Sequence, residues 1–381
     1  MSDIATRVER AGFYAGQNRG VAIAVKVIIV ALVLWASLAA DAGRILMEVQ
    51  SATIAYFGGW YVYTSAAFMI SSLLLASLPR TGQIRLGSEN STPEFSRFAW
   101  FSMMFGAGIG VGMLTYSTAE PLAHFANNPD VIMGTTSALA PNNLASAYKW
   151  TLLHYGLTPW GCYAIVGMSL AYFAYRRDMP LTIRSPFTAV LQPELARRVG
   201  GVVDAAAILA TIIGIGVTIG YGVNQLTFGI YQITYWDWLM TDGKPSLTAL
   251  SLSVIFLTLA AMLSALSGIG RGIRWLSNLN MALSWLLLAV FIIFGATAFA
   301  GEMFVAGLSE YLSAIPAMSV TIWGGGSTET ARALKDWQSA WTIFYWAWWI
   351  AFTPFVGLFL ARVSQGRTIR EYVVGAILLP S

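Results

Sequence analysis

The sequence is poor in charged residues and nearly free of cysteine. Only 10% of its 381 residues are Asp, Glu, Lys or Arg, whereas a soluble globular domain carries about 25%. So few charges cannot cover a surface that faces water, which excludes an ordinary soluble protein. A single cysteine, Cys162, excludes an intrachain disulfide, and its apolar neighbours favour a small buried side chain over a reactive thiol.

The sequence also lacks the residue sets that catalysis requires. Its two histidines, His124 and His154, lie far apart in the chain, and a metal site needs more ligands than they supply. No nucleophile motif and no paired carboxylate lies in the apolar segments. Glu120, beside Pro121, is more typical of a structural or gating carboxylate than of a catalyst. We therefore expect no enzyme, no cofactor and no catalytic metal.

Long apolar stretches dominate the chain, which is 57% hydrophobic. A helix needs roughly 20 mostly apolar residues to cross a bilayer. Eight stretches meet this length, at about 21–40, 56–78, 98–117, 150–175, 202–222, 247–267, 279–300 and 340–361. A ninth begins near Tyr372, and we expect the chain to stop inside it, at Ser381. The pattern predicts an all-α, polytopic membrane protein.

The basic residues predict its orientation. Of the 22 lysines and arginines, 16 fall in the N-terminal tail and in every second connection after it, five fall in the alternate connections, and Lys26 lies in the first apolar stretch. Basic residues accumulate on the cytoplasmic side of a membrane. We expect a multi-pass protein of the cell inner (plasma) membrane with a cytoplasmic N-terminus.

The third apolar stretch contains four glycines at alternate positions, in the run Phe105–Gly112. Each glycine inside a helix costs about 1 kcal/mol relative to alanine. One interpretation is a locally unwound helix whose carbonyl oxygens coordinate a cation in mid-membrane. The other is close packing of two helices through small residues. The glycines alone do not decide between these two.

Two aromatic clusters follow. Trp160 and Tyr163 are three residues apart and share a helix face, with Tyr155 about one turn earlier. The run Trp341–Phe352 contains four tryptophans, one tyrosine and two phenylalanines. Interfacial belts and core packing explain part of this enrichment. A box of aromatic faces, however, is also how proteins hold a quaternary ammonium group, which neither donates nor accepts a hydrogen bond.

These stretches resemble the betaine/choline/carnitine transporter (BCCT) family. The resemblance runs from about residue 20 to the end. Its strongest match is Trp341–Ile350, continued by Pro354–Gly357 and Ala361–Glu371. Further matches are Ile84–Gly87, Pro93–Phe95, the glycine run with Glu120-Pro121, and Pro159-Trp160.

The resemblance implies a LeuT-like fold, in which two leading helices precede two inverted five-helix repeats. Residues 1–95 would then hold the N-terminal tail and the leading helices, and 96–300 the first repeat. Residues 301–338 would form an outside segment, with a short amphipathic helix at Met303–Leu312 and a flexible turn at Trp323–Ser327. Residues 339–381 would begin an incomplete second repeat.

The resemblance also implies a substrate box. Its residues would be Tyr155, Trp160, Tyr163 and Trp349, with Phe352 adjacent. Tyr155 and Phe352 stand where tryptophan is typical of betaine-specific members. Both keep an aromatic face, so an onium solute still fits, and a sulfonium such as dimethylsulfoniopropionate would suit the same box.

For a coupling ion, the resemblance implies two sodium sites. One would use backbone carbonyls near Gly106 and Ile109. The other matches at Thr211 and Phe355, but Ile215 takes the place of its second threonine and offers no side-chain oxygen. Sodium at one site, proton coupling and sodium-independent exchange therefore all stay open.

The resemblance as a whole implies a secondary active transporter. It would import a quaternary-ammonium or sulfonium compatible solute such as glycine betaine, choline or carnitine, coupled to sodium or protons. Its partners would be that solute, the lipid bilayer and two further copies in a homotrimer, with no nucleic acid. The alternative is a non-transporting fragment or membrane sensor that retains the aromatic box.

Overall fold

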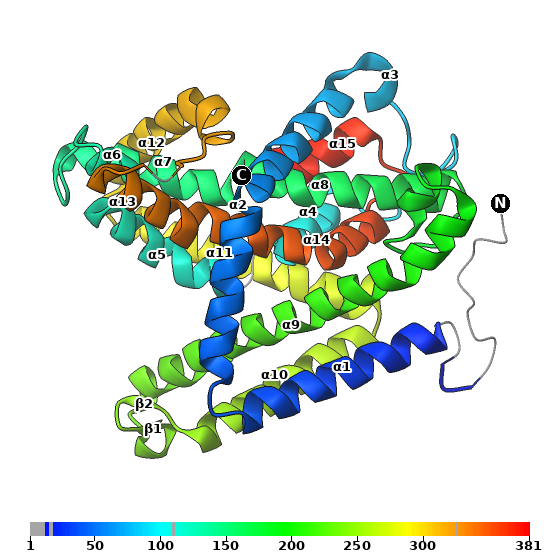
Figure 1. The fold of residues 1–381 in the computed structure, drawn as a ribbon, viewed down its shortest axis with the longest axis horizontal. Coiled ribbons are helices and arrows are strands. Elements are labelled where there is room, and N and C mark those ends of the chain that lie inside the picture. The colour runs from blue at the N-terminus through cyan, green and yellow to red at the C-terminus, as the bar shows by residue number, and fades with distance from the viewer. Residues whose placement is uncertain (1–11, 15–17, 109–110, 325) are drawn as a thin grey trace. The chain divides into compact units, whose positions relative to one another are not determined.

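The computed structural model describes residues 12–14, 18–108, 111–324 and 326–381, and most of these residues are helical (Figure 1). The first part of the chain contains α1 (Arg19–Leu38), α2 (Ala42–Ser77), α3 (Pro79–Gly82), α4 (Arg97–Gly108), α5 (Val111–Ala126), α6 (Pro129–Ile132), α7 (Leu144–Tyr155) and α8 (Leu157–Ala171). The second part contains α9 (Pro193–Thr234), the two-residue strands β1 (Met240–Thr241) and β2 (Lys244–Pro245), α10 (Leu247–Leu266), α11 (Arg274–Phe294), α12 (Thr297–Met318), α13 (Glu329–Gln338), α14 (Phe344–Val363) and α15 (Ile369–Val373). β1 and β2 pair antiparallel as a short hairpin.

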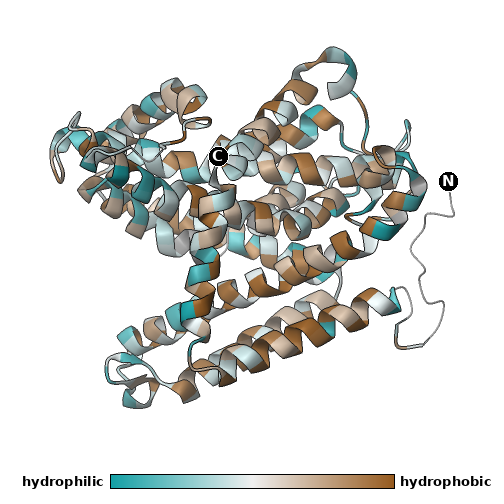
Figure 2. Cartoon of the chain, viewed as in Figure 1, coloured by the Kyte–Doolittle hydropathy of each residue, from teal (hydrophilic) through white to brown (hydrophobic). Residues whose placement is uncertain are grey.

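Within the described ranges, six helices are long and apolar enough to cross a membrane. They correspond to six of the eight expected stretches and are α1, α2, Glu194–Thr234 of α9, α10, Arg271–Phe294 and Glu329–Val363. Figure 2 shows the apolar colouring that runs along α1 and α10. The prediction of an all-α membrane protein is thus confirmed.

The other two expected spans are each covered by two helices. In the stretch 98–117, α4 runs to Gly108 and α5 starts at Val111, and residues 109–110 between them lie outside the described residues. The stretch 150–175 is divided between α7 and α8 at Gly156, whose φ of −85° and ψ of −139° are not helical. The prediction of a continuous fourth span was wrong because hydropathy averages over a window and does not register one non-helical residue.

The segment 301–338 holds more helix than the sequence predicted. The amphipathic helix expected at Met303–Leu312 is longer, since α12 runs from Thr297 to Met318. A second helix, α13, follows the glycine-containing turn, of which Gly325 lies outside the described residues. Thr328 caps α13 by accepting a hydrogen bond from the Ala331 N–H at 3.2 Å, the usual role of threonine at a helix start.

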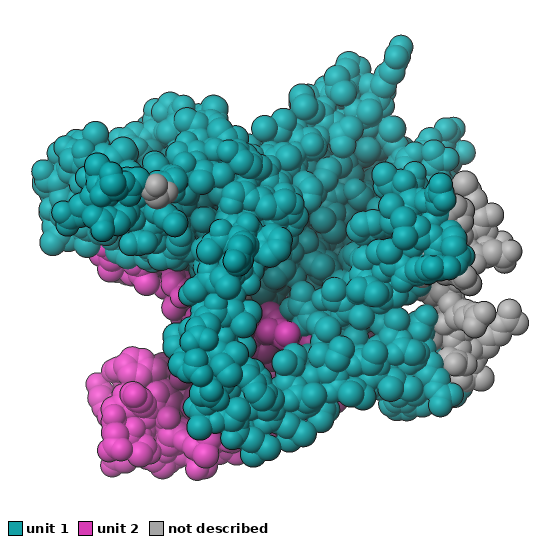
Figure 3. All heavy atoms as spheres, viewed as in Figure 1, with its two compact units in different colours: residues 1–94, 123–211, 303–381 teal, residues 95–122, 212–302 magenta. Residues whose placement is uncertain are grey.

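The chain divides into two compact units, coloured separately in Figure 3. Unit 1 comprises residues 1–94, 123–211 and 303–381, and unit 2 comprises 95–122 and 212–302. In unit 2, α4 packs against α11, and a Cβ at Gly106 would lie 3.4 Å from the Ser277 hydroxyl oxygen. Gly106 therefore faces α11 at a distance where a Cβ would make an ordinary van der Waals contact, so this contact does not decide between the two interpretations of the glycine run.

In unit 1, α8 packs against both α2 and α14. A Cβ at Gly161 of α8 would lie 2.5 Å from the Met69 Cα of α2. A Cβ at Gly357 of α14 would lie 3.2 Å from the Gly167 backbone nitrogen of α8. Glycine at these positions lets backbone meet backbone, which fixes the spacing of the three helices.

Gly161→Ala should therefore destabilise the protein, because the added methyl group would meet backbone that cannot rotate away. Overpacking of this kind costs about 1–3 kcal/mol. Gly229→Ala is the matched control, since a Cβ there meets no atom within 4 Å and alanine favours a helix interior. Thermal unfolding in detergent should show a lower midpoint for Gly161→Ala and an unchanged or higher one for Gly229→Ala. Equal midpoints would contradict the close contact of α2 and α8.

Candidate functional site

The non-helical residue Gly156 sets up the candidate site. It ends α7 at Tyr155 and lets α8 begin anew at Leu157. The Leu157 N–H, which has no partner in its own helix, donates to the Tyr311 hydroxyl of α12 at 2.8 Å. Across the break, the Trp160 indole N–H donates to the Tyr155 carbonyl at 2.9 Å. Hydrogen bonds from the Leu157 N–H and the Trp160 indole N–H thus stabilise the break between α7 and α8.

Three of the expected box residues form one ring cluster. The Trp160 and Tyr163 ring centroids of α8 lie 5.5 Å and 4.9 Å from that of Trp349 on α14. Trp160 and Tyr163 themselves are 5.8 Å apart and nearly perpendicular, at 84°. All three side chains are buried. We call Trp160, Tyr163 and Trp349 the inner ring cluster.

The other two expected box residues have different ring partners. The Tyr155 hydroxyl lies 2.7 Å from that of Tyr345, and their ring centroids are 5.4 Å apart. The Phe352 ring lies 6.3 Å from that of Trp348. Tyr155 does not share a continuous helix with Trp160 as the sequence suggested, because the chain breaks between them. It adjoins the inner ring cluster through its backbone carbonyl.

The structure brings the two histidines together, which sequence distance did not suggest. Their ring centroids are 5.7 Å apart, and both side chains are fully buried. His154 stacks on Tyr345 at 4.9 Å and 14°, and its Nε2 lies 3.0 Å from the Thr342 hydroxyl. We name the histidine layer as His124, His154, Trp337, Trp341 and Tyr345.

Sequence reasoning missed this layer because α5, α7, α13 and α14 meet only in three dimensions. One signal was present. His154 directly precedes Tyr155, so any role for Tyr155 places an imidazole beside the site. The layer continues to Trp150, whose ring lies 5.1 Å from that of Trp337.

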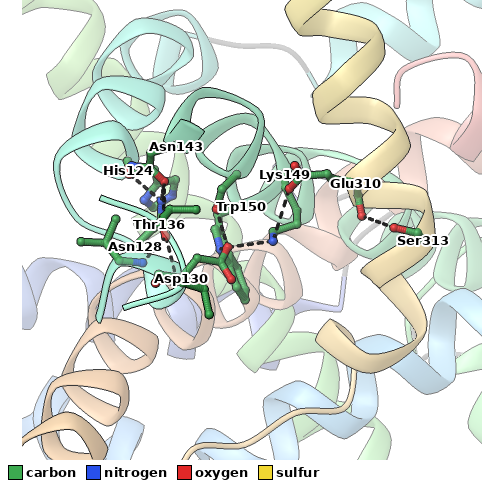
Figure 4. A network of polar contacts seen from close by, with 12 residues as sticks. His124, Asn128, Asp130, Thr136, Asn143, Lys149, Trp150, Glu310 and Ser313 are labelled. Carbon is green, nitrogen blue, oxygen red and sulfur yellow. Dashed lines mark hydrogen bonds and ion pairs between the residues drawn. The ribbon is translucent and has the colours of Figure 1, made fainter. Parts of the chain in front are cut away.

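A polar network lies next to Trp150 (Figure 4). The Asp130 carboxylate accepts from the Trp150 indole N–H at 2.9 Å and from the Ser146 hydroxyl, and it pairs with the Lys149 ammonium at 2.7 Å. Lys149 also lies 3.5 Å from the Glu310 carboxylate of α12. Burial by itself would raise the pKa of Asp130, but the bonds to Lys149, Ser146 and Trp150 outweigh it and lower that pKa.

Two buried asparagines, Asn128 and Asn143, make hydrogen bonds to the end of α5. The Asn128 amide N–H donates to the Asn143 side-chain oxygen at 2.7 Å and to the His124 carbonyl at 2.7 Å. The Asn143 amide donates to the Phe125 carbonyl at 2.7 Å. These bonds satisfy the carbonyls at the end of α5, where a helix leaves its last four acceptors without partners. They also fix His124 relative to α7.

The residues expected to bind a cation are placed as follows. Gly106 lies within α4, and Ile109 lies outside the described residues. The Thr211 hydroxyl donates to the Ala207 carbonyl of its own helix at 2.8 Å, which leaves its oxygen able to accept or coordinate. Phe355 lies on α14 and is partly exposed.

Comparison with known proteins gives one family. A sequence model described as BCCT, the betaine/carnitine/choline family transporter, matches residues 20–381. The osmo-dependent choline transporter BetT2 of Acinetobacter baylyi is 37% identical over 339 residues, which cover 89% of this chain and 47% of that protein. The high-affinity choline transport protein of Escherichia coli K12 is 38% identical over 322 residues, or 84% of this chain and 45% of that protein. The glycine betaine transporter OpuD of Bacillus subtilis is 34% identical over 92% of this chain and 65% of its own length. The chain thus spans about half to two-thirds of the length of these relatives.

Asp130→Asn should destabilise unit 1, because it removes the ion pair with Lys149 and leaves a partly buried ammonium. We expect a loss of about 1–3 kcal/mol near pH 7, typical of hydrogen bonds to charged groups. Asp41→Asn is the matched control. Its carboxylate is 53% exposed in a pair with Arg44, against 15% for Asp130, and exposed pairs contribute little.

The stabilising effect of Asp130 should also depend on pH. The pKa of Asp130 is lower in the folded than in the unfolded protein. The ionised carboxylate therefore stabilises the folded protein at pH values above its unfolded-state pKa, and this stabilisation is lost as the pH falls through the folded-state pKa. The difference in unfolding midpoint between wild type and Asp130→Asn should therefore shrink below about pH 3.8, the ordinary aspartate value. A difference that stayed constant in acid would show that the charge of Asp130 is not what stabilises the network.

Proposed function

This chain belongs to the betaine/carnitine/choline transporter family, and from that premise we propose that it binds and imports a quaternary-ammonium or sulfonium solute. Members of this family are transporters with a LeuT-like fold and are not enzymes, as the sequence led us to expect. The solute class includes glycine betaine, choline and carnitine. Import would be driven by sodium or protons, in the cell inner membrane, with the N-terminus in the cytoplasm and the protein assembled as a homotrimer.

The observation that supports this most directly is the inner ring cluster. Trp160, Tyr163 and Trp349 present three buried aromatic rings within 6 Å of one another. An onium group carries a positive charge that no hydrogen bond can satisfy. Each desolvated ring face contributes about 2 kcal/mol to holding such a cation. The charge can therefore be bound in the apolar interior without an ionised partner, whose own burial would be costly.

The break at Gly156 supports the same proposal. It places the backbone carbonyl of Tyr155, the start of α8 and the Trp160 ring at one point of unit 1. Irregular backbone at membrane depth is tolerated where protein or a water-filled cavity surrounds it, and solute sites in transporters are typically built from discontinuous helices. The family's solute site would thus be assembled mainly from α8 and α14.

Trp349→Ala should weaken onium binding by about 30-fold, which corresponds to the loss of one ring face at about 2 kcal/mol. Trp349→Phe keeps a smaller aromatic face and should retain most of the affinity. Trp60→Ala is the control, because that ring is 54% exposed on α2. Tryptophan fluorescence of the purified wild type and of each variant, titrated with choline, glycine betaine, carnitine and dimethylsulfoniopropionate, measures the affinities.

The titration is repeated with and without sodium. A sodium dependence of the affinity would identify the coupling ion. Saturable quenching by one solute, lost in Trp349→Ala and kept in Trp60→Ala, would support the proposal. The proposal would be contradicted if Trp349→Ala and Trp60→Ala lost affinity equally, or if Trp349→Ala bound the solute as tightly as wild type. Binding without uptake by reconstituted vesicles would favour the alternative of a non-transporting protein that keeps the box.

A further inference from the structure

The histidine layer is a second aromatic cage in unit 1. Tyr345 stacks on the His154 ring, and the Trp346 ring, which adjoins the layer, lies 6.0 Å from His154 and nearly perpendicular to it, at 79°. Trp341 lies 4.7 Å from the His124 ring. Trp337 contacts both imidazoles, at 5.3 Å and 5.9 Å. Four aromatic side chains and the carboxylate of Glu120 thus surround the two imidazole rings.

Such a cage can stabilise a protonated imidazole by the interaction that holds an onium group. The faces of tryptophan and tyrosine attract cations irrespective of their chemical type. Histidine is the side chain whose ordinary titration falls between pH 5 and 8. The layer can therefore accept one positive charge, supplied by a proton rather than by a solute.

The layer and the inner ring cluster are directly connected. His154 is followed by Tyr155, whose carbonyl accepts from the Trp160 indole and whose hydroxyl meets that of Tyr345. On α14, Tyr345 precedes Trp349 by four residues, or about one helical turn. A charge on His154 would consequently lie one to two helical turns from the rings that hold the solute.

The other groups that face the pair do not change the sign of this effect. From α5 comes the buried carboxylate of Glu120, one oxygen of which lies within 4.8 Å of a ring nitrogen of His124 and of His154. From α14 and α7 come the hydroxyls of Tyr345 and Tyr155. Whatever the state of Glu120, adding one proton to the pair adds one positive charge. That charge must disfavour a second cation nearby.

We propose that His154 and His124 bind a proton in competition with the onium solute, so that the neutral pair is the state that binds it tightly. The inference rests on the proposed function. Choline is the suitable probe, because it carries no carboxylate that could offset its charge. Two unit charges about 10 Å apart at an effective dielectric constant of about 20 repel enough to weaken binding roughly tenfold.

The first experiment measures choline affinity of the purified chain between pH 8 and pH 5.5. Wild type should bind roughly tenfold more weakly at the acidic end. The double variant His124→Gln/His154→Gln replaces both imidazoles with neutral amides, one of which can still reach the Thr342 hydroxyl. It should bind choline with the same affinity at both pH values. Wild-type binding that does not change with pH, or a pH dependence that survives in the double variant, would overturn the inference.

A second measurement does not depend on the double variant folding. The chain has two histidines, so selective ¹⁵N-histidine labelling reports on this pair alone. Because linkage is reciprocal, saturating choline at pH 5.5 should reduce the imidazolium signal of the wild-type protein. An unchanged imidazolium signal in the presence of bound choline would overturn the proton competition and leave the proposed function intact. Absence of choline binding already at pH 8 would overturn the proposed function, and this inference with it.

Discussion

The rings of the candidate site come from two helices, and their positions depend on how closely α8 packs against α14. Glycines face backbone at this contact, with Gly357 of α14 against Gly167 of α8, while Gly161 of α8 meets Met69 of α2. Because glycines let the helices approach closely, Trp160 and Tyr163 reach Trp349 at centroid distances of 4.9–5.5 Å. A larger residue at these glycines would move the walls of the site apart.

Charge is distributed in unit 1 in a way that suits a cation held by aromatic faces. The ion pairs Asp130–Lys149 and Lys149–Glu310 lie among α6, α7 and α12, and Arg362 pairs with Glu94 at 2.7 Å. The inner ring cluster is made of neutral side chains. An ionised residue buried there would pay a desolvation cost, whereas indole and phenol faces attract a cation without one. The histidine layer is the place beside the cluster where charge can change.

Much of this was predictable from the sequence. Long apolar stretches placed the helices, and the spacing of Trp160 and Tyr163 placed two rings on one helix face. The family motif around Trp349 predicted the third ring. The break at Gly156 was not predictable, because hydropathy windows smooth over one residue and glycine occurs in many continuous membrane helices. The pairing of His124 with His154 was also hidden, since it depends on α5, α7 and α13 meeting in space. Helix α13 was missed because a glycine-rich turn precedes it and its own residues are polar.

The central claim is that aromatic faces hold the solute's positive charge, and fluorination of one ring tests it most directly. Fluorotryptophans with one to four fluorine atoms keep the shape of the indole and progressively weaken the negative potential of its face. Placed at position 349 in the full chain, they should lower choline affinity step by step, with the logarithm of the affinity falling linearly with the number of fluorines. An affinity that stays constant across the series would contradict a cation–π site at Trp349 and leave shape or packing as the role of that ring.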